Sequence, residues 1–214
     1  MKKIMFNDKY GLTQAVLDGR KTQTRRIATI QPPYKNSEIC FPTDVLLEDE
    51  PEKHPLWLAY CWRNKDNPEE FTSWIKPKYK ENEFIAVAQS YEDCGNLPDF
   101  ELDEDGYPIM PKRSGCFNKM FVRADLMPNQ IRIIKVRIQR LQNISDEDCL
   151  AEGIYEDSGD DKFPPSVFYD FGGNEDDGFD TPREAYKVLI DKVSGKGTWE
   201  SNPYVWVYEF ELVK

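Results

Sequence analysis

The chain has 214 residues, of which 39% are hydrophobic and 31% are charged. A chain of this length buries about 70% of its unfolded surface on folding, so it needs neither disulfides nor a metal ion to hold a core. The net charge of −11 excludes proteins that hold duplex DNA through a general excess of lysine and arginine. Contact with nucleic acid must therefore use a local basic patch, or recognise a single base or nucleoside.

Cysteine usage and hydropathy indicate a cytoplasmic protein. Five cysteines are spread along the chain without a CxxC pair, which favours reduced thiols over a disulfide framework or a zinc ribbon. No stretch approaches the ~20 apolar residues of a membrane span, and no apolar segment of a signal peptide follows the N-terminal lysines. We expect no membrane partner and no cofactor, and the sequence leaves the oligomeric state open.

Residues 3–26 are predicted to form a strand, a short helix and a second strand. The helix is expected to begin with Asn7 or Asp8 as its cap and to end at Gly19. The segment that follows, residues 20–26, is the most basic of the chain.

Three long stretches are predicted to be loop-like insertions in a single domain spanning residues 1–214. They are rich in proline, glycine and charged residues, and they cover residues 30–80, 92–118 and 155–180. Aromatic residues in the first insertion are expected to pack against the core.

Three further strands are predicted outside these insertions. Residues 83–91 indicate a buried strand, and residues 204–212 a long strand with one aromatic face. Within residues 131–141 the apolar positions change parity between Ile133 and Ile134, which predicts a bulge or a bend.

Two more helices are predicted from their caps. Ser145 is expected to cap the first, which ends at Gly153, and Thr181 to cap the second, which ends at Gly195. Short helices among scattered strands lack the regular alternation of a Rossmann fold. The sequence therefore predicts an α+β protein with a mixed, barrel-like sheet.

Several common kinds of active site are disfavoured by the residues available. The single histidine, His54, lies among prolines and glutamates, which suits neither a catalytic triad nor a histidine metal site. The acidic run at residues 175–177 lacks EF-hand spacing and indicates a solvated loop. We therefore expect no metal.

The basic segment offers a site that does not need histidine. The turn after Gly19 allows Lys21 and Thr24 to converge. A lysine whose pKa is lowered by burial, or by neighbours such as Arg20, Arg25 and Arg26, can activate a threonine hydroxyl. The alternative is a solvated or acid-paired surface turn.

Glu152 is the second candidate residue. It falls in the last turn of the helix that Ser145 caps, where the helix dipole disfavours a carboxylate. It therefore needs a cationic partner or acquires a raised pKa. The alternative is an ordinary exposed glutamate before Gly153.

Three segments resemble the ASCH family, whose members have a PUA-like β-barrel. Residues 19–26, Gly-Arg-Lys-Thr-Gln-Thr-Arg-Arg, resemble the family signature G-x-K-x-x-T-x-R. Residues 141–154 and 195–207 continue the likeness, which is to the longer phage- and prophage-associated members and covers about half of the chain. The resemblance implies a PUA-like mixed barrel with short flanking helices, and a protein that binds or processes RNA or a modified nucleoside.

Small members of this family include N4-acetylcytidine amidohydrolases, whose lysine, threonine and glutamate match Lys21, Thr24 and Glu152. The resemblance implies Thr24 as the nucleophile, Lys21 as its base, and Glu152 as a proton carrier or lysine partner. Longer members carry an Arg/Glu pair where this chain has Ala88 and Gln89, which favours a lost or altered activity.

The candidates for substrate binding are Arg20, Arg25, Arg26 and Gln89. One hypothesis is an enzyme that hydrolyses an amide of a modified nucleoside. The others are a module that binds single-stranded RNA or a nucleoside through the same cleft without catalysis, and a phage accessory protein with neither activity. The acidic net charge favours a small substrate over long RNA.

Overall fold

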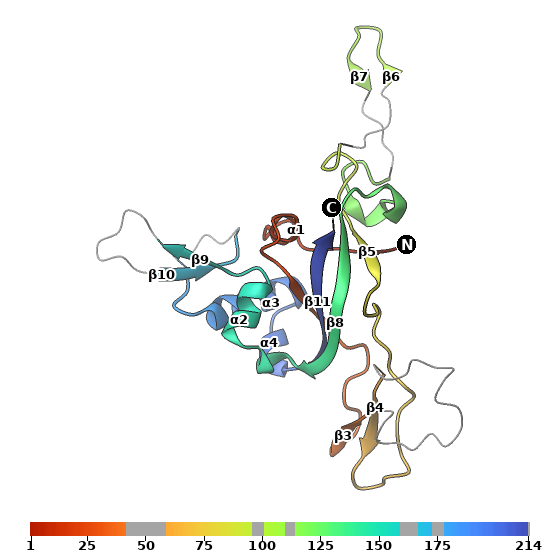
Figure 1. Ribbon diagram of the computed structural model, residues 1–214, viewed down its shortest axis with the longest axis vertical. Coiled ribbons are helices and arrows are strands. Elements are labelled where there is room, and N and C mark those ends of the chain that lie inside the picture. Colours follow the sequence, from red (N-terminus) through yellow and green to blue (C-terminus); the bar gives the residue numbers. More distant parts are fainter. Residues whose placement is uncertain (42–58, 96–100, 110–113, 159–166, 173–177, 214) are drawn as a thin grey trace.

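The protein is a mixed α+β structure with a five-stranded sheet at its centre (Figure 1). A computed structural model describes residues 1–41, 59–95, 101–109, 114–158, 167–172 and 178–213. No helix in these ranges is both long enough and apolar enough to cross a membrane.

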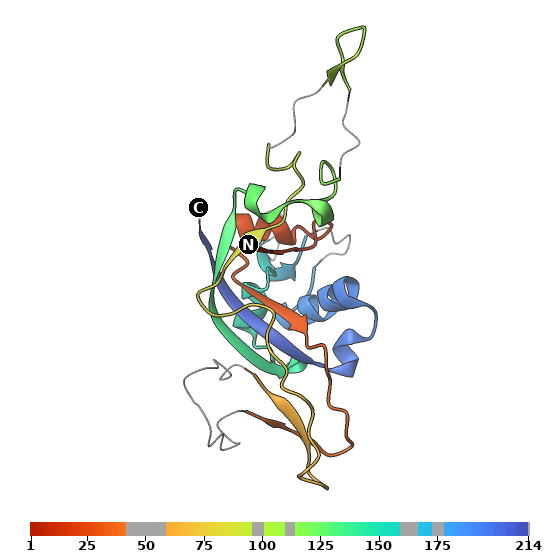
Figure 2. The same ribbon diagram turned by 90° about the vertical axis from the view of Figure 1, so that its right-hand side faces the viewer.

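The central sheet is strongly curved but is not a closed barrel. Its strands, in spatial order, are β1 (Lys2–Ile4), β5 (Phe84–Val87), β8 (Gln130–Arg140), β11 (Tyr204–Val213) and β2 (Gln23–Ile27). Only β1 and β5 are parallel, and the long strands β8 and β11 bend together in Figure 2. The edge strands β1 and β2 do not pair with each other within the described ranges, which leaves a gap at the point where a barrel would close.

A β-bulge in β8 contributes to this curvature, as the sequence predicted. Glu209 of β11 lies opposite Lys135, whereas the next residue, Phe210, lies opposite Ile133. Ile134 is left without a partner and is exposed. The change of apolar parity between Ile133 and Ile134 therefore marks the bulge, which increases the local twist and bends the strand.

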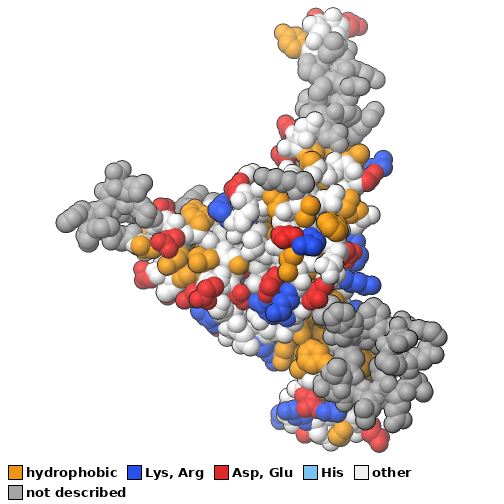
Figure 3. All heavy atoms as spheres, viewed as in Figure 1, with side chains coloured by type: hydrophobic (Ala, Val, Ile, Leu, Met, Phe, Trp, Pro, Cys, Tyr) orange, Lys and Arg blue, Asp and Glu red, His pale blue; other side chains and the backbone are white. Residues whose placement is uncertain are grey.

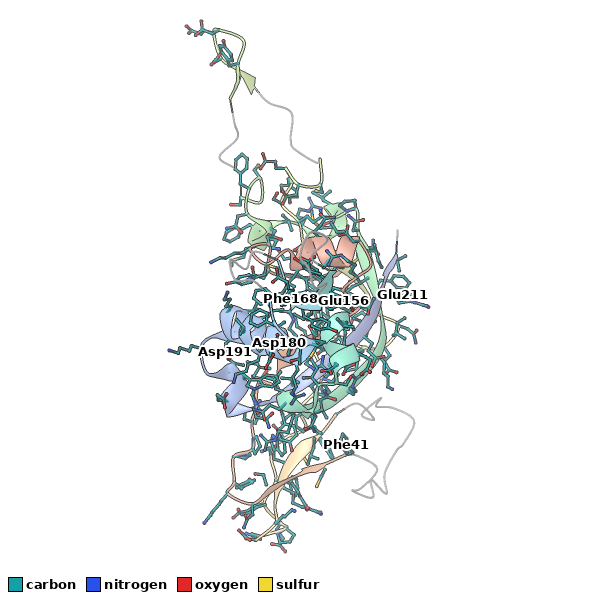
Figure 4. The ribbon with its side chains drawn as sticks, turned by 90° about the vertical axis from the view of Figure 1, so that its left-hand side faces the viewer. Phe41, Glu156, Phe168, Asp180, Asp191 and Glu211 are labelled. Atoms are coloured by element: carbon teal, nitrogen blue, oxygen red, sulfur yellow. The ribbon has the colours of Figure 1, made fainter. Side chains whose placement is uncertain are left out.

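Four short helices pack beside the sheet: α1 (Leu12–Leu17), α2 (Asp146–Ala151), α3 (Pro182–Ser194) and α4 (Thr198–Ser201). Figure 4 shows α3, which carries Asp191, on one flank of the sheet and Glu211 of β11 on the other. Three 3₁₀ turns occur at Lys119–Phe121, Ala124–Leu126 and Leu141–Asn143.

The predicted caps of α2 and α3 are confirmed, whereas that of α1 is wrong. The hydroxyls of Ser145 and Thr181 accept hydrogen bonds from the third backbone N–H of their helices. Helix α1 begins after Gly11, which has a left-handed backbone, because Asn7 and Asp8 precede a separate turn. The predicted end at Gly19 is confirmed by its positive φ of 76°.

The predicted insertions contain short hairpins that the sequence analysis assigned to loops. The strand pairs are β3 (Ser37–Cys40) with β4 (Cys61–Asn64), β6 (Glu101–Leu102) with β7 (Pro108–Ile109), and β9 (Tyr155–Ser158) with β10 (Val167–Asp170). These strands are two to four residues long, too short for a clear alternation. Figure 1 shows the three hairpins extending in different directions. His54 and residues 175–177 lie outside the described ranges.

The hairpin β3–β4 is anchored to the central sheet by aromatic side chains. The ring centroids of Tyr60 and Trp206 lie 5.3 Å apart, and those of Trp62 and Tyr204 lie 4.6 Å apart. Tyr60 and Trp62 are completely buried. The expectation that the first insertion packs against the core is thus confirmed.

Candidate active site

A pocket of about 380 Å³ lies between β2, the segment after β1, and helix α3. Its polar lining comes from Lys21, Thr24, Arg25, Arg26, Glu152 and Tyr186. Its apolar wall includes Phe6, Leu12, Leu189 and Ile190. Four segments of the chain therefore meet here: the segment after β1, the basic segment after α1, the end of α2, and α3.

Lys21 is buried and is held by an acid from the other half of the chain. Its Nζ donates to Oε2 of Glu152 at 2.6 Å and to the backbone oxygen of Glu152 at 2.5 Å. Only 2% of Lys21 and 4% of Glu152 is exposed. Burial lowers the pKa of Lys21, the charge of Glu152 opposes this effect, and nearby Arg26 and Arg25 reinforce it.

Glu152 occupies the C-cap of α2, where the sequence predicted either a cationic partner or a raised pKa, and Lys21 is that partner. Gly153 follows with a positive φ of 105°, and a Cβ there would lie 3.4 Å from Leu12 and 3.5 Å from Lys21. A Cβ at these distances would make ordinary van der Waals contact, so the glycine is required for its positive φ, which turns the chain at the end of α2.

Arg25 supports the second carboxylate oxygen of Glu152. Its guanidinium donates to Oε1 of Glu152 at 3.0 Å and to Oδ2 of Asp148 at 2.5 Å. Burial acts to raise the pKa of Asp148, but a hydrogen bond from Gln23 and the charges of Arg25 and Arg137 lower it overall. Arg25 was predicted to bind substrate; it lines the pocket, and its hydrogen bonds position Glu152 and Asp148.

Thr24 also lines this pocket. It lies on β2 opposite Tyr208 of β11, and only 4% of the residue is exposed. Within the described part of the chain, no hydrogen bond joins its hydroxyl to another group. This hydroxyl is therefore available to a ligand or to a reaction.

Tyr186 is a pocket residue that the sequence analysis did not assign to the site. It lies on α3 with 2% exposure, and its hydroxyl has no hydrogen-bond partner among the described residues. Burial and the charge of Glu152 raise its pKa well above the ordinary value, so it remains a neutral donor. The available signal was a tyrosine in a buried helical stripe, since a buried phenol usually requires a partner.

Comparisons with protein-family models, with curated proteins and with solved structures find no match to this chain. The pocket must therefore be interpreted from its own chemistry. In the described ranges, no group of three or more His, Cys, Asp or Glu side chains is placed to hold a metal ion.

Of the remaining predicted site residues, one lines the pocket and two lie elsewhere. Arg26 lines the pocket, where its guanidinium donates to the backbone oxygen of Met5 at 2.6 Å. Arg20 instead lies beside a separate surface hollow, 5.8 Å from the ring centroid of Tyr155. Gln89 does not line the pocket, because it follows β5 and its side chain accepts a hydrogen bond from Asn129.

Proposed function

We propose that this pocket hydrolyses an amide of a small modified nucleoside, such as N4-acetylcytidine, on a PUA-like fold related to the ASCH proteins. The observation that carries the proposal is a buried lysine with a lowered pKa, paired at 2.6 Å with Glu152, in the pocket that also holds the free hydroxyl of Thr24. The curved sheet, with its gap between β1 and β2, supports the proposed kinship to a barrel.

The reaction would begin with transfer of a proton from Lys21 to Glu152. This leaves an uncharged amine and an uncharged acid, a pair that burial favours over two separate charges. The amine of Lys21 then takes the proton of the Thr24 hydroxyl, whose oxygen attacks the amide carbonyl carbon. Glu152 returns its proton to the departing nitrogen as the C–N bond breaks, leaving an acyl ester on Thr24.

Water completes the cycle by the same route. A second proton transfer between Lys21 and Glu152 again frees the amine, which takes a proton from the attacking water. Glu152 protonates the Thr24 oxygen as the ester bond breaks, and the carboxylic acid product leaves. The starting charges of all three residues are restored.

Two other pocket residues suit the charge that develops on the carbonyl oxygen. The neutral hydroxyl of Tyr186 can donate to this oxygen, and Arg26 adds a positive charge in the same pocket. Donors of this kind stabilise the tetrahedral intermediate more than the bound amide, so they act on the rate as well as on binding.

The size and charge of the pocket favour a nucleoside over a long nucleic acid. A volume of about 380 Å³ is within the range of small-molecule sites. The net charge of −11 opposes extended binding of a polyanion.

A second candidate function is binding of a modified nucleoside without hydrolysis. It is favoured by one observation: Lys21 donates to both the side chain and the backbone oxygen of Glu152, as a purely structural cation would. In this case the Thr24 hydroxyl would only donate to, or accept from, the ligand.

An assay of N4-acetylcytidine deacetylation, monitored through the release of cytidine, distinguishes the two functions. The enzyme hypothesis predicts turnover that Thr24→Val reduces by at least ~100-fold, because the nucleophile is lost. Thr22→Val is the matched control, since Thr22 is exposed and lies outside the pocket. Binding without turnover in the unmodified protein would contradict the enzyme and support the second candidate.

A further inference from the structure

A second pocket, also of about 380 Å³, lies beside the candidate active site at the gap between the edge strands β1 and β2. The two pockets share Met5, Arg26 and Ile27 in their linings. Met5 and Ile27 are exposed at this boundary. A ligand in the first pocket can therefore extend past Arg26 into the second.

The second pocket is positively charged in a strongly acidic protein. Arg26, Lys76 and Lys78 line it, and none of its lining residues in the described part of the chain is an aspartate or a glutamate. None of these three cations forms an ion pair with a described residue. Arg26 uses one of its five N–H donors on the backbone oxygen of Met5. Lys3 also lines the pocket, but its ammonium group uses two of its three donors on the backbone oxygens of Met120 and Val122, so it has less left for a ligand.

Aromatic residues form the floor of this pocket and fix the position of one lysine. The hydroxyl of Tyr208 accepts a hydrogen bond from the backbone N–H of Lys78 at 3.0 Å. The hydroxyl of Tyr79 donates to the backbone oxygen of Lys3 at 3.1 Å. These aromatic residues add ring surface to the lining, to which Thr29 and the cations contribute further polar groups.

The cations of the second pocket differ from the charge distribution on the rest of the molecule. On the face drawn in Figure 3, acidic and basic side chains are interspersed. Three unpaired cations around one hollow are therefore a local exception in a chain of net charge −11. Guanidinium and ammonium groups of this kind bind phosphate by charge-assisted hydrogen bonds.

We propose that the second pocket binds a phosphate group attached to the nucleoside whose modified base occupies the candidate active site. The inference rests on the proposed function and narrows its substrate class to a nucleotide, either a monophosphate or a unit within a single strand. Arg26, which lines both pockets, would contact the nucleotide between its base and its phosphate.

The test compares ligands that differ only in phosphate. Dissociation constants are measured by calorimetry for N4-acetylcytidine, its 5′- and 3′-monophosphates, and a short single-stranded RNA containing one N4-acetylcytidine. The protein carries Thr24→Val, so that no ligand is consumed. We expect at least one phosphorylated ligand to bind about tenfold more tightly than the nucleoside, with a gain that shrinks as salt increases.

Two double variants test whether this gain in affinity comes from the second pocket. Lys76→Ala/Lys78→Ala should abolish it without changing the affinity for the nucleoside. Lys65→Ala/Lys135→Ala removes the same charge from exposed positions outside both pockets and should leave the gain intact. If a monophosphate shows the gain in affinity, the phosphate can come from a free nucleotide. If only the single-stranded RNA shows it, the phosphate comes from the strand.

The outcomes separate the two proposals. Equal affinity for the nucleoside and every phosphorylated ligand overturns the phosphate site alone, as does a gain that survives Lys76→Ala/Lys78→Ala. If no ligand binds, and the unmodified protein does not deacetylate any of them, both the proposed function and the phosphate site are wrong.

Discussion

Lys21 and Glu152 form a buried ion pair, and Arg25 forms a second ion pair with the other carboxylate oxygen of Glu152. Moving both charges out of water is costly, so such a pair contributes little net stability. Removing one partner is different, because the other charge then stays buried without compensation. The pair thus fixes the geometry of the pocket strongly, whatever chemistry it performs.

Glu152→Gln should lower the free energy of unfolding by roughly 3 kcal/mol, measured by urea denaturation at pH 7. Glu200→Gln is the matched control, because Glu200 forms an exposed ion pair with Lys187. That variant should cost less than about 1 kcal/mol. Equal costs for the two variants would show that the Lys21–Glu152 pair is not buried as described.

The pKa of Asp148 predicts how its contribution depends on pH. Because the folded-state pKa is lowered, the unfolded chain binds a proton more readily, and stability falls as pH decreases through this range. Asp148→Asn should therefore destabilise the protein by about 2 kcal/mol at pH 7. The difference should diminish below pH ~4 and vanish below the lowered pKa. A difference that is constant from pH 7 to pH 2 would contradict this account.

At the scale of the elements, the end of α2 decides whether the site forms. Ser145 starts this helix, Glu152 caps its C-terminus, and Gly153 turns the chain with a positive φ. The sequence predicts both ends of α2 because capping is local. It also predicts that Glu152 has a cationic partner or a raised pKa. The hairpins β3–β4 and β9–β10, in contrast, are too short to be recognised from periodicity.

Gly153→Ala tests whether this glycine is needed only for the turn. Gly19→Ala is the control, since both glycines have positive φ but a Cβ at Gly19 would meet nothing within 4 Å. Both variants incur the backbone penalty of about 1 kcal/mol, and the two costs should be similar because a Cβ at Gly153 would make ordinary van der Waals contact with Leu12 and Lys21. Thermal unfolding compares the two variants, and a much lower melting temperature for Gly153→Ala would contradict this interpretation.

At the scale of the whole molecule, the sequence predicts an α+β protein and its charge, but only part of the site. The basic motif identifies Lys21 and Thr24, whereas Gln89 lies elsewhere because two strands separate β5 from β2 in the sheet. Tyr186 enters the site only through the packing of α3. Such contacts depend on how distant segments pack, which neither local propensity nor the spacing of a motif determines.

The net charge of −11 leads to a prediction about nucleic acids. Duplex DNA should not bind measurably at about 150 mM salt, because a net charge of −11 opposes the neutralisation of many phosphates. Electrophoretic mobility shift with a mixed-sequence duplex measures this. Tight retention of the duplex would mean that an extended basic surface dominates over the net charge.

Rapid-quench mass spectrometry during turnover of N4-acetylcytidine tests whether Thr24 is the nucleophile that the Lys21–Glu152 pair activates. If it is, one acetyl group should appear on the intact protein, map to the peptide that contains Thr24, and be absent from Thr24→Val. Turnover without any acylated protein, at a rate that Thr24→Val leaves unchanged, would rule out this role for Thr24.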